Sequence, residues 1–325
     1  MDFEPGFEWG SVDPLRAEPA VLALARSPNP LGPLGDLPGT WKGQGFNAIW
    51  RPHQVGLPGE PPGQDRVLEL NLTEETLQFT RIPGAIPNRG LLQPDINLFG
   101  VTYLQQITDR LMKVGIHAEP GVWASVPLTQ DPNEPASVVR MASIPHGTTI
   151  NAQGTGKPNN SGGPEIKPNN IIPFKIGNPD QQFDFPELHL ATPSQFRIPQ
   201  PPQLSQIQQS MVDNPNSVLT DAIKGQNITK TTVLMIDTTP AAPIVAGGGT
   251  DNIAFLKGTA ADDSKANADA AEMSAIFWIE TVEEPGKPPF LQLQYTQTVL
   301  LNFNTLSWPH VSVATLRKVS EHPAA

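Results

Sequence analysis

Two stretches near the ends of the chain constrain the fold more than any other feature. Gly39–Asn47 (GTWKGQGFN) alternates with a period of two, and Trp308–Arg317 (WPHVSVATLR) reads as the last strand. A strand-rich chain leaves no free sheet edge when it closes into a barrel, and closure requires the first and last strands to pair. The sequence therefore predicts a barrel closed by these stretches, with Trp41 and Arg317 stacked across its floor.

Between these stretches, further strand-like segments recur at regular intervals, separated by loops rich in Pro, Gly, Asn and Asp. We predict an all-β fold, an antiparallel barrel of about ten strands. The short segment Thr73–Glu75 predicts a hairpin turn between the first two of the intervening strands. The expected strands are Arg66–Leu72, Thr76–Ile82, Asn97–Thr108, Gly115–Val126, Ser137–Ser143, Thr148–Gln153, Asn227–Thr238, Asn252–Leu256, Met273–Val282 and Phe290–Phe303.

The chain divides into an arm, a barrel and an insert. Residues 1–37 are rich in Pro, Gly and acidic side chains and predict an arm that lies on the barrel and plugs one end, with a helical turn at Pro19–Arg26. We expect residues 38–325 to form a single barrel domain. Within it, residues 154–226 are rich in Pro and Asn and hold too few consecutive apolar residues for a second core. We expect short helices in this insert at Leu204–Val212 and Ser217–Lys224.

Composition excludes several classes of function. The 325 residues carry a net charge of −11 and no cysteine, so thiolate catalysis and Cys-ligated metal centres are ruled out. An acidic chain without a basic stripe is not expected to bind nucleic acid. No signal-peptide pattern and no apolar run of membrane-spanning length is visible, so we expect no membrane insertion and a cytoplasmic location.

Three histidines are candidates for a site. His310 begins the last strand after Pro309 and Trp308, and either binds a ligand inside the barrel, with Trp308 as a wall, or only hydrogen-bonds a loop. His117 and Glu119 share one strand face, where a carboxylate could orient an imidazole; the alternative is a polar pair on the outer surface. His146 lies in a turn and is either a group over a bound ligand or a plain turn residue.

The remaining histidines and a row of polar residues carry less information. His53, His189 and His322 lie in Pro-rich loops or the tail, and we expect them to be solvated. One face of Phe290–Phe303 is polar and would suit either a cavity or a wet outer surface. That face carries Gln292, Gln294, Thr296, Thr298 and Asn302.

Three motifs together resemble a known family. They are Trp41-Lys42-Gly43-Gln44-Gly45, Gly115–Trp123 (GIHAEPGVW) and Val139–Asn151 (VRMASIPHGTTIN). In order and rough spacing they resemble the nitrobindin family, a haem-binding branch of the calycin barrels, which include lipocalins and fatty-acid-binding proteins. The pairing of Trp41 with Arg317 is also similar to that of calycins. Residues 154–226 have no counterpart in the family.

The resemblance implies a cofactor and a chemistry. It implies haem b, bound through its iron by His310, and reactions with nitric oxide or the isomerisation of peroxynitrite. Imidazole suits iron because it is neutral near neutral pH.

Three hypotheses therefore stand. In the first, the barrel binds a small hydrophobic ligand or haem in its cavity. In the second, it is a cofactor-free enzyme that uses His117, Glu119 or His146. In the third, it is a non-catalytic carrier of lipids or small molecules, with the insert as its partner surface. The sequence makes no prediction about oligomeric state.

Overall fold

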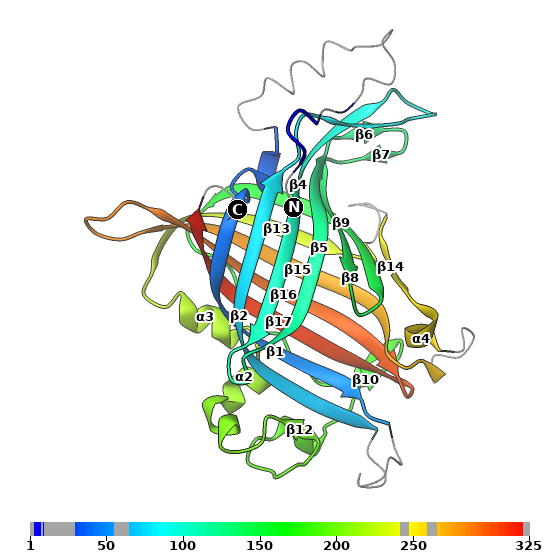
Figure 1. Cartoon of the computed structure of the whole chain (residues 1–325), viewed down its shortest axis with the longest axis vertical. Coiled ribbons are helices and arrows are strands. Elements are labelled where there is room, and N and C mark those ends of the chain that lie inside the picture. Colours follow the sequence, from blue (N-terminus) through cyan, green and yellow to red (C-terminus); the bar gives the residue numbers. More distant parts are fainter. Residues whose placement is uncertain are drawn as a thin grey trace.

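A computed structural model describes residues 3–7, 9, 30–54, 65–240, 247–258 and 265–320, and shows a closed antiparallel barrel of ten strands (Figure 1). This confirms the predicted fold class. In order around the barrel the strands are β1 (Gly39–Pro52), β2 (Arg66–Arg81), β4 (Ile96–Asp109), β5 (Val114–Val126), β8 (Ser137–Ile144), β9 (Thr148–Ser161), β13 (Asn227–Asp237), β15 (Asp269–Glu283), β16 (Phe290–Phe303) and β17 (Leu306–Ser320).

Shorter elements decorate the barrel. The short strands are β3 (Ile86–Asn88), β6 (Thr129–Gln130), β7 (Asn133–Glu134), β10 (Phe174–Lys175), β11 (Asn178–Gln182), β12 (Arg197–Ile198) and β14 (Gly249–Asn252). The helices are η1 (Gly32–Leu34), η2 (Pro186–Leu188), η3 (Gln203–Gln206), α2 (Gln209–Asp213), α3 (Ser217–Ala222) and α4 (Ala254–Lys257).

The barrel closes where β1 pairs with β17, as predicted. Asn47 lies opposite Ser312, and Gly45 lies opposite Ala314. A Cβ atom on Gly45 would lie 2.1 Å from the carbonyl oxygen of Val313, so the close approach of the two strands requires glycine there.

The predicted stacking of Trp41 on Arg317 is wrong. The register places Arg317 opposite Lys42, on the other face of the strand from Trp41. The guanidinium carbon of Arg317 instead lies 3.9 Å from the ring centroid of Phe290, and the Lys318 Nζ lies 5.6 Å from the ring of Trp41.

Three predicted boundaries are also wrong. The expected hairpin at Thr73–Glu75 does not form, because Arg66–Arg81 is one continuous strand paired on both sides with β1 and β4. The expected strand Asn252–Leu256 is the end of β14 followed by α4. β9 continues to Ser161, where it pairs with β13, so the insert begins about eight residues later than predicted.

The apolar interior of the barrel is plugged at one end by the chain that precedes β1. Leu31, Leu34 and Leu37 are buried in the same core as Trp41, and the indole Nε1 of Trp41 donates to the carbonyl oxygen of Leu37 at 2.8 Å. Part of the predicted arm therefore covers a barrel end. The predicted helical turn at Pro19–Arg26 and His322 lie outside the described residues.

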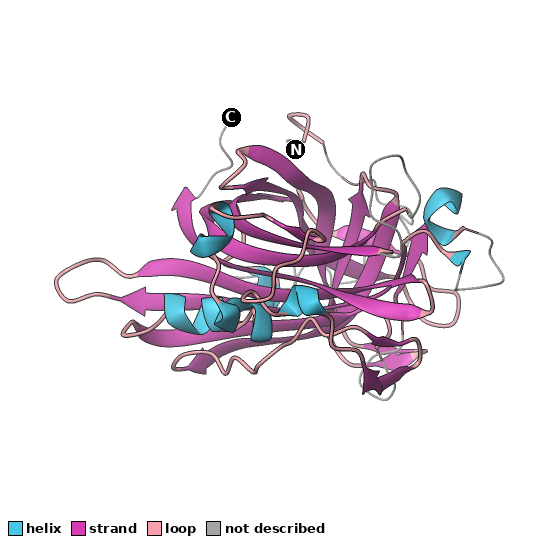
Figure 2. Ribbon diagram, turned by 90° about the horizontal axis from the view of Figure 1, so that it is seen from below, coloured by secondary structure: helices cyan, strands magenta, loops and turns pink. Residues whose placement is uncertain are grey.

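A second core lies outside the barrel, between its wall and the insert at residues 162–226. Figure 2 shows the helices of this insert along one side of the sheet. Trp50 and Trp308 are buried there, and the Nε1 of Trp50 donates to the carbonyl oxygen of Ile171 at 2.8 Å. The insert and the outer face of the barrel wall therefore share one apolar core.

The polar row of β16 lies beneath this insert. Gln294 Nε2 donates to the carbonyl oxygen of Leu219 at 3.0 Å, and Thr298 Oγ1 accepts from Asn169 Nδ2 at 2.9 Å. The row thus faces outward, but the insert shields it from solvent.

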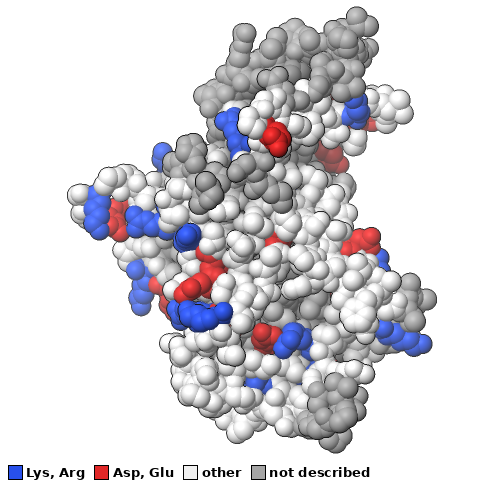
Figure 3. All heavy atoms as spheres, in the orientation of Figure 1, with Lys and Arg blue, Asp and Glu red and all other residues white. Residues whose placement is uncertain are grey.

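Charge is sparse and mixed on the face in Figure 3, where Lys and Arg alternate with Asp and Glu among uncharged residues. Among the described residues, no helix has both the length and the apolar character needed to cross a bilayer.

The carboxyl group of Glu280, on the outer wall beneath the insert, makes the fold sensitive to pH. Burial raises the pKa of Glu280 to about 7, although Gln292 donates to it at 2.6 Å. A carboxyl group whose pKa is raised on folding stabilises the protein at low pH, and this stability is lost as the pH rises from 4.5 to 7.

We therefore expect Glu280→Gln to stabilise the protein at pH 8 by on the order of 3 kcal/mol and to leave stability at pH 4.5 nearly unchanged. Urea unfolding at the two pH values measures this difference. Equal effects of the substitution at both values would contradict the assignment.

Candidate functional site

Three histidines from distant parts of the chain meet at the barrel end opposite η1, which we call the histidine end. His310 lies near the start of β17, His117 near the start of β5, and His146 in the turn between β8 and β9. Because neighbouring strands are antiparallel, these positions all fall at the same end. The structure thus brings together the three histidines that the sequence singled out.

His310 faces the barrel interior and is held by hydrogen bonds. Its Nε2 lies 2.9 Å from Oδ1 of Asn47, and the hydroxyl of Ser312 donates to the same Oδ1 at 2.8 Å. An amide oxygen is an acceptor, so Nε2 carries the proton and Nδ1 carries the lone pair. Burial lowers the pKa of His310 to about 3, with a further contribution from charge on His117 and His146. The ring is therefore neutral at physiological pH.

Beside His310 the inner wall is apolar. Val299 lies directly opposite His310 across β16 and β17, and Met273 lies opposite Val299 on β15. Directly opposed residues in antiparallel strands project to the same face, so a neutral imidazole and two apolar side chains form one row of the wall.

His117 and Glu119 also face inward, not outward. Glu119 Oε2 lies 3.3 Å from Nε2 of His117, while Oε1 contacts the guanidinium of Arg140 and the hydroxyl of Tyr103. Glu119 and Arg140 are almost completely buried, with exposed fractions of 0% and 1%. Burial alone would raise the pKa of Glu119, but Arg140, His117 and Tyr103 outweigh it and lower the pKa to about 2. Glu119 is therefore a permanent carboxylate that can orient His117.

A second polar network crosses the interior between β2, β4 and β16. The hydroxyl of Tyr295 donates to Glu75 at 2.7 Å, the hydroxyl of Thr73 donates to Glu75 at 2.9 Å, and Gln105 Nε2 contacts both Glu75 and Tyr295. Burial raises the pKa of Glu75 in spite of these donors. The barrel interior is thus mixed in polarity rather than purely apolar.

The histidine end borders solvent at His146. Pairing between β5 and β8 runs only from Gly121 and Ala142 to the other end, so the first half of β5 has no β8 partner. His146 is exposed there, and its ring lies edge-on to that of His117, with centroids 6.2 Å apart. Burial followed by charge on His117 lowers the pKa of His146. His117 keeps 18% of its side chain accessible, which places it between the solvent and the interior.

The three histidines do not form a binding site for a bare metal ion. Within the part of the chain that the structure describes, no group of three or more His, Asp or Glu side chains has the geometry to hold one.

Trp308 is not a wall of this site. Its ring stacks on Phe303 in the outer core with centroids 4.7 Å apart, and its Nε1 donates to the carbonyl oxygen of Phe303.

His189 pairs with Asp184 in the insert, and His53 packs against Phe196.

Sequence reasoning missed Arg140 and Asn47 as members of the site. The signal for Arg140 is a lone charge at an inward position between Val138 and Ala142, which are both apolar. Asn47 shares a face with Trp41, and that face is the interior.

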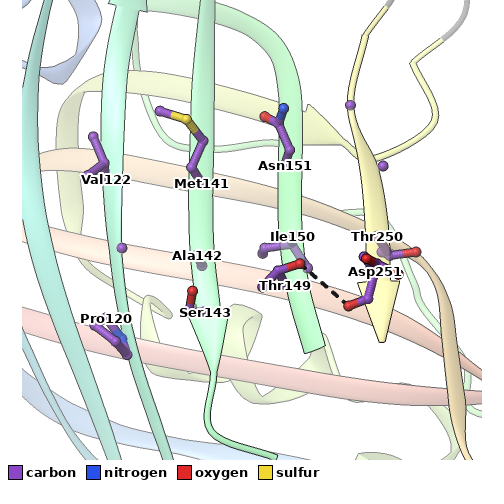
Figure 4. A pocket seen from close by; sticks show the side chains of 13 residues that line it. Pro120, Val122, Met141, Ala142, Ser143, Thr149, Ile150, Asn151, Thr250 and Asp251 are labelled. Carbon is purple, nitrogen blue, oxygen red and sulfur yellow. Dashed lines mark hydrogen bonds between the residues drawn. The ribbon is translucent and has the colours of Figure 1, made fainter. Parts of the chain in front are cut away.

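The outer surface has a concavity of about 560 Å³ over β5, β8, β9 and β14 (Figure 4). Its lining consists mainly of small or apolar side chains such as Val122, Met141 and Thr149. Asp251, its one titratable group, is engaged by Lys257. With a single titratable group that is already paired, this surface is a weaker candidate for a catalytic site than the histidine end.

Comparisons with known proteins give no family. No protein-family model and no curated protein matches the chain. Among solved structures, the crystal structure of Rv2717c from M. tuberculosis is similar, with a TM-score of 0.38 and 12% identity, covering 93% of this chain and 99% of that chain. A likeness of this size assigns no function.

The buried pair Arg140–Glu119 makes a first test of the site. Removing one partner leaves an uncompensated charge, so we expect Arg140→Met to destabilise the protein by roughly 3–5 kcal/mol. The double variant Arg140→Met with Glu119→Gln removes both charges and should recover a large part of that loss in chemical unfolding. Equal destabilisation of the single and double variants would contradict a paired charge.

The neutral state of His310 predicts a sensitivity to acid. Because its pKa falls from 6.5 to about 3 on folding, stability is fully present above pH 6.5 and is lost as the pH falls below it. Between pH 7.5 and 5 the wild type should lose about 2 kcal/mol from this group. In urea unfolding, the free energy of unfolding of His310→Gln should fall by about 2 kcal/mol less than that of the wild type over the same pH range. If the free energy of unfolding changes equally with pH in the variant and the wild type, His310 does not have the lowered pKa.

Proposed function

We propose that the barrel binds one small molecule at its histidine end and that His310 is the main ligating residue. The observation that carries this proposal is a neutral imidazole inside the barrel beside the apolar Val299, with His117 and the exposed His146 at the same barrel end. Eight- to ten-stranded barrels commonly enclose a single small ligand.

Haem b is the ligand that we propose most specifically. The donor set fits it in two respects: His310 is neutral with a lone pair on one ring nitrogen, and the neighbouring row of the wall is apolar. Proteins can hold haem iron through a single imidazole, so His310 alone would suffice as the protein ligand. His310 would hold the iron, with Asn47 fixing the orientation of its ring.

When bound, haem would supply an iron that can take a diatomic ligand or peroxynitrite, which is the chemistry that the sequence resemblance implies. The chain's own groups would act around it. His117, whose Nε2 lies 3.3 Å from Oε2 of Glu119, would be oriented by that carboxylate and would transfer protons through its ring nitrogens. His146 lies on the solvent side and would exchange protons with water.

A second candidate is a cofactor-free enzyme in which His117 transfers protons. The chain of contacts Arg140–Glu119–His117 favours it, because a carboxylate fixed by an arginine orients the imidazole. In such an enzyme His117 would transfer the proton, and His310 would bind no cofactor.

Titration with hemin distinguishes the two. For wild-type protein we expect a saturable one-to-one shift of the Soret band, and for His310→Gln a loss of at least tenfold in affinity or a different Soret position. His189→Gln is the matched control, because it removes a histidine from the insert surface. A Soret shift that is identical in the His310 variant would contradict His310 as the ligand, and no shift in the wild type would exclude haem.

A further inference from the structure

A groove of about 600 Å³ lies on the outside of the barrel, where helices α2 and α3 of the insert approach β1, β16 and β17. A space of this volume is the usual size of a small-molecule site. The apolar part of its lining is made by Leu72, Met211, Val218 and Phe290. The cationic part is made by Lys42, Arg110 and Arg317. These cations gather in one groove although the chain as a whole has a net charge of −11.

Two of the cations lie next to each other on neighbouring strands. Lys42 on β1 is the direct partner of Arg317 on β17, and both residues line the groove. Directly opposed side chains in antiparallel strands project to the same face with Cβ atoms roughly 4.5–5.5 Å apart, and like charges in this arrangement are destabilising. An anion bound between the two side chains would remove this repulsion.

No carboxylate of the described residues neutralises the three cations. In that part of the chain, no ion pair is formed by Lys42, Arg110 or Arg317. Glu284, the one acidic residue among the described residues of the lining, pairs with Lys287 at 2.6 Å, while Arg317 acts on it only at longer range. Glu74 lies opposite Gln44 on β2 and pairs with Lys113 at 3.6 Å. Three cations and one anion thus leave the lining with two positive charges in excess.

Neutral groups hold the two arginines in place and leave donors free. The guanidinium carbon of Arg317 lies 3.9 Å from the ring centroid of Phe290, and Arg110 Nη1 donates to Oε1 of Gln44 at 3.0 Å. A guanidinium has five N–H donors in a planar fork, and this fork matches the oxygens of a phosphate group. The contact with Phe290 also places an aromatic ring directly beside the cationic part of the groove.

Charge and polarity together favour a dianion that carries an apolar substituent. A phosphate monoester has a charge of about −1.5 to −2 at pH 7 and three acceptor oxygens, which matches the two excess positive charges. A monoanion would leave one of these charges uncompensated. An aromatic ring attached to the phosphate could pack on Phe290 and Val218.

We propose that this groove is a second ligand site, which binds a soluble aryl phosphate monoester. The phosphate would lie between Lys42 and Arg317, Arg110 would supply a third positive charge, and the ring would pack on the apolar lining. This proposal stands independently of ligand binding at the histidine end, because it uses no residue of the barrel interior.

Phenyl phosphate is the probe, and phenyl sulfate is the matched compound because it has nearly the same shape and a single negative charge. With full-length protein at pH 7.5 and low salt, we expect ligand-observed NMR to give a Kd for phenyl phosphate on the order of 1 mM. Phenyl sulfate should bind at least fivefold more weakly. His310→Gln should leave the binding of phenyl phosphate unchanged, which separates this site from the interior one.

Variants of Lys42 test the site and distinguish binding from a structural role. Lys42→Gln should weaken the binding of phenyl phosphate at least fivefold. Lys175→Gln is the matched control, because it removes an exposed lysine whose partner on β17 is Leu306, far along the strand from Arg317. Lys42→Glu places a carboxylate opposite Arg317, so without ligand this variant should unfold at a higher temperature than the wild type, and it should not bind phenyl phosphate.

Four results would overturn the proposal. The first is equal binding of phenyl phosphate and phenyl sulfate, and the second is binding of phenyl phosphate that survives Lys42→Gln. The third is a lowered unfolding temperature of both Lys42 variants without ligand, which would make Lys42 a structural residue. The fourth is a wild type that binds vesicles containing phosphatidate but not phenyl phosphate, which would assign the cations to a membrane surface.

Discussion

The pairing of β1 with β17 is the constraint on which the rest of the structure depends. It closes the barrel and fixes the register that places Asn47 opposite Ser312, so that Asn47 can accept from both Ser312 and His310. A shift of one residue would turn every side chain of β17 to the other face. His310 would then face the insert, and the outer core at Trp308 would lose its packing. Glycine at position 45 allows the strands the close approach that this register needs.

Inside the closed barrel, polar groups are placed in pairs rather than singly. Arg140 with Glu119 and Tyr295 with Glu75 are buried, and each has several hydrogen bonds. Burying charge is costly, and replacement of a buried ion pair by apolar residues often leaves stability unchanged or raises it. The pairing at Glu119 therefore does more for His117 than for the fold, because it keeps a carboxylate charged next to an imidazole in a closed interior.

The sequence predicts the strands well because their signal is local. Alternation and turn residues fix β4, β5 and β16 to within a residue or two, and the pairing of first and last strands follows from the need to hide sheet edges. The failures have tertiary causes. Thr73–Glu75 resembles a turn because it is polar, yet Thr73 and Glu75 are inward polar residues of one long strand. Glu75 accepts hydrogen bonds from Thr73 and from Tyr295, which lies 220 residues further along the chain.

The site is predicted in part. Three of its histidines are visible as candidates in the sequence, but their convergence depends on strand order, and the face on which His117 lies depends on barrel closure. Arg140 and Asn47 are missed because each is a single polar residue whose partners lie far away in the chain. Trp308 is misplaced because the insert, which covers it, offers no periodic pattern from which its contacts could be read.

Ligand binding at the histidine end requires His310 to be a neutral imidazole, protonated on Nε2, with its other nitrogen available to a ligand. Long-range ¹⁵N–¹H NMR of the histidine rings at pH 5 tests it most directly, with His310→Gln providing the assignment. We expect one neutral ring with a protonated Nε2 and an unprotonated Nδ1 at a pH where solvated histidines are cationic. A cationic His310 at pH 5, or a neutral ring protonated on Nδ1, would contradict it.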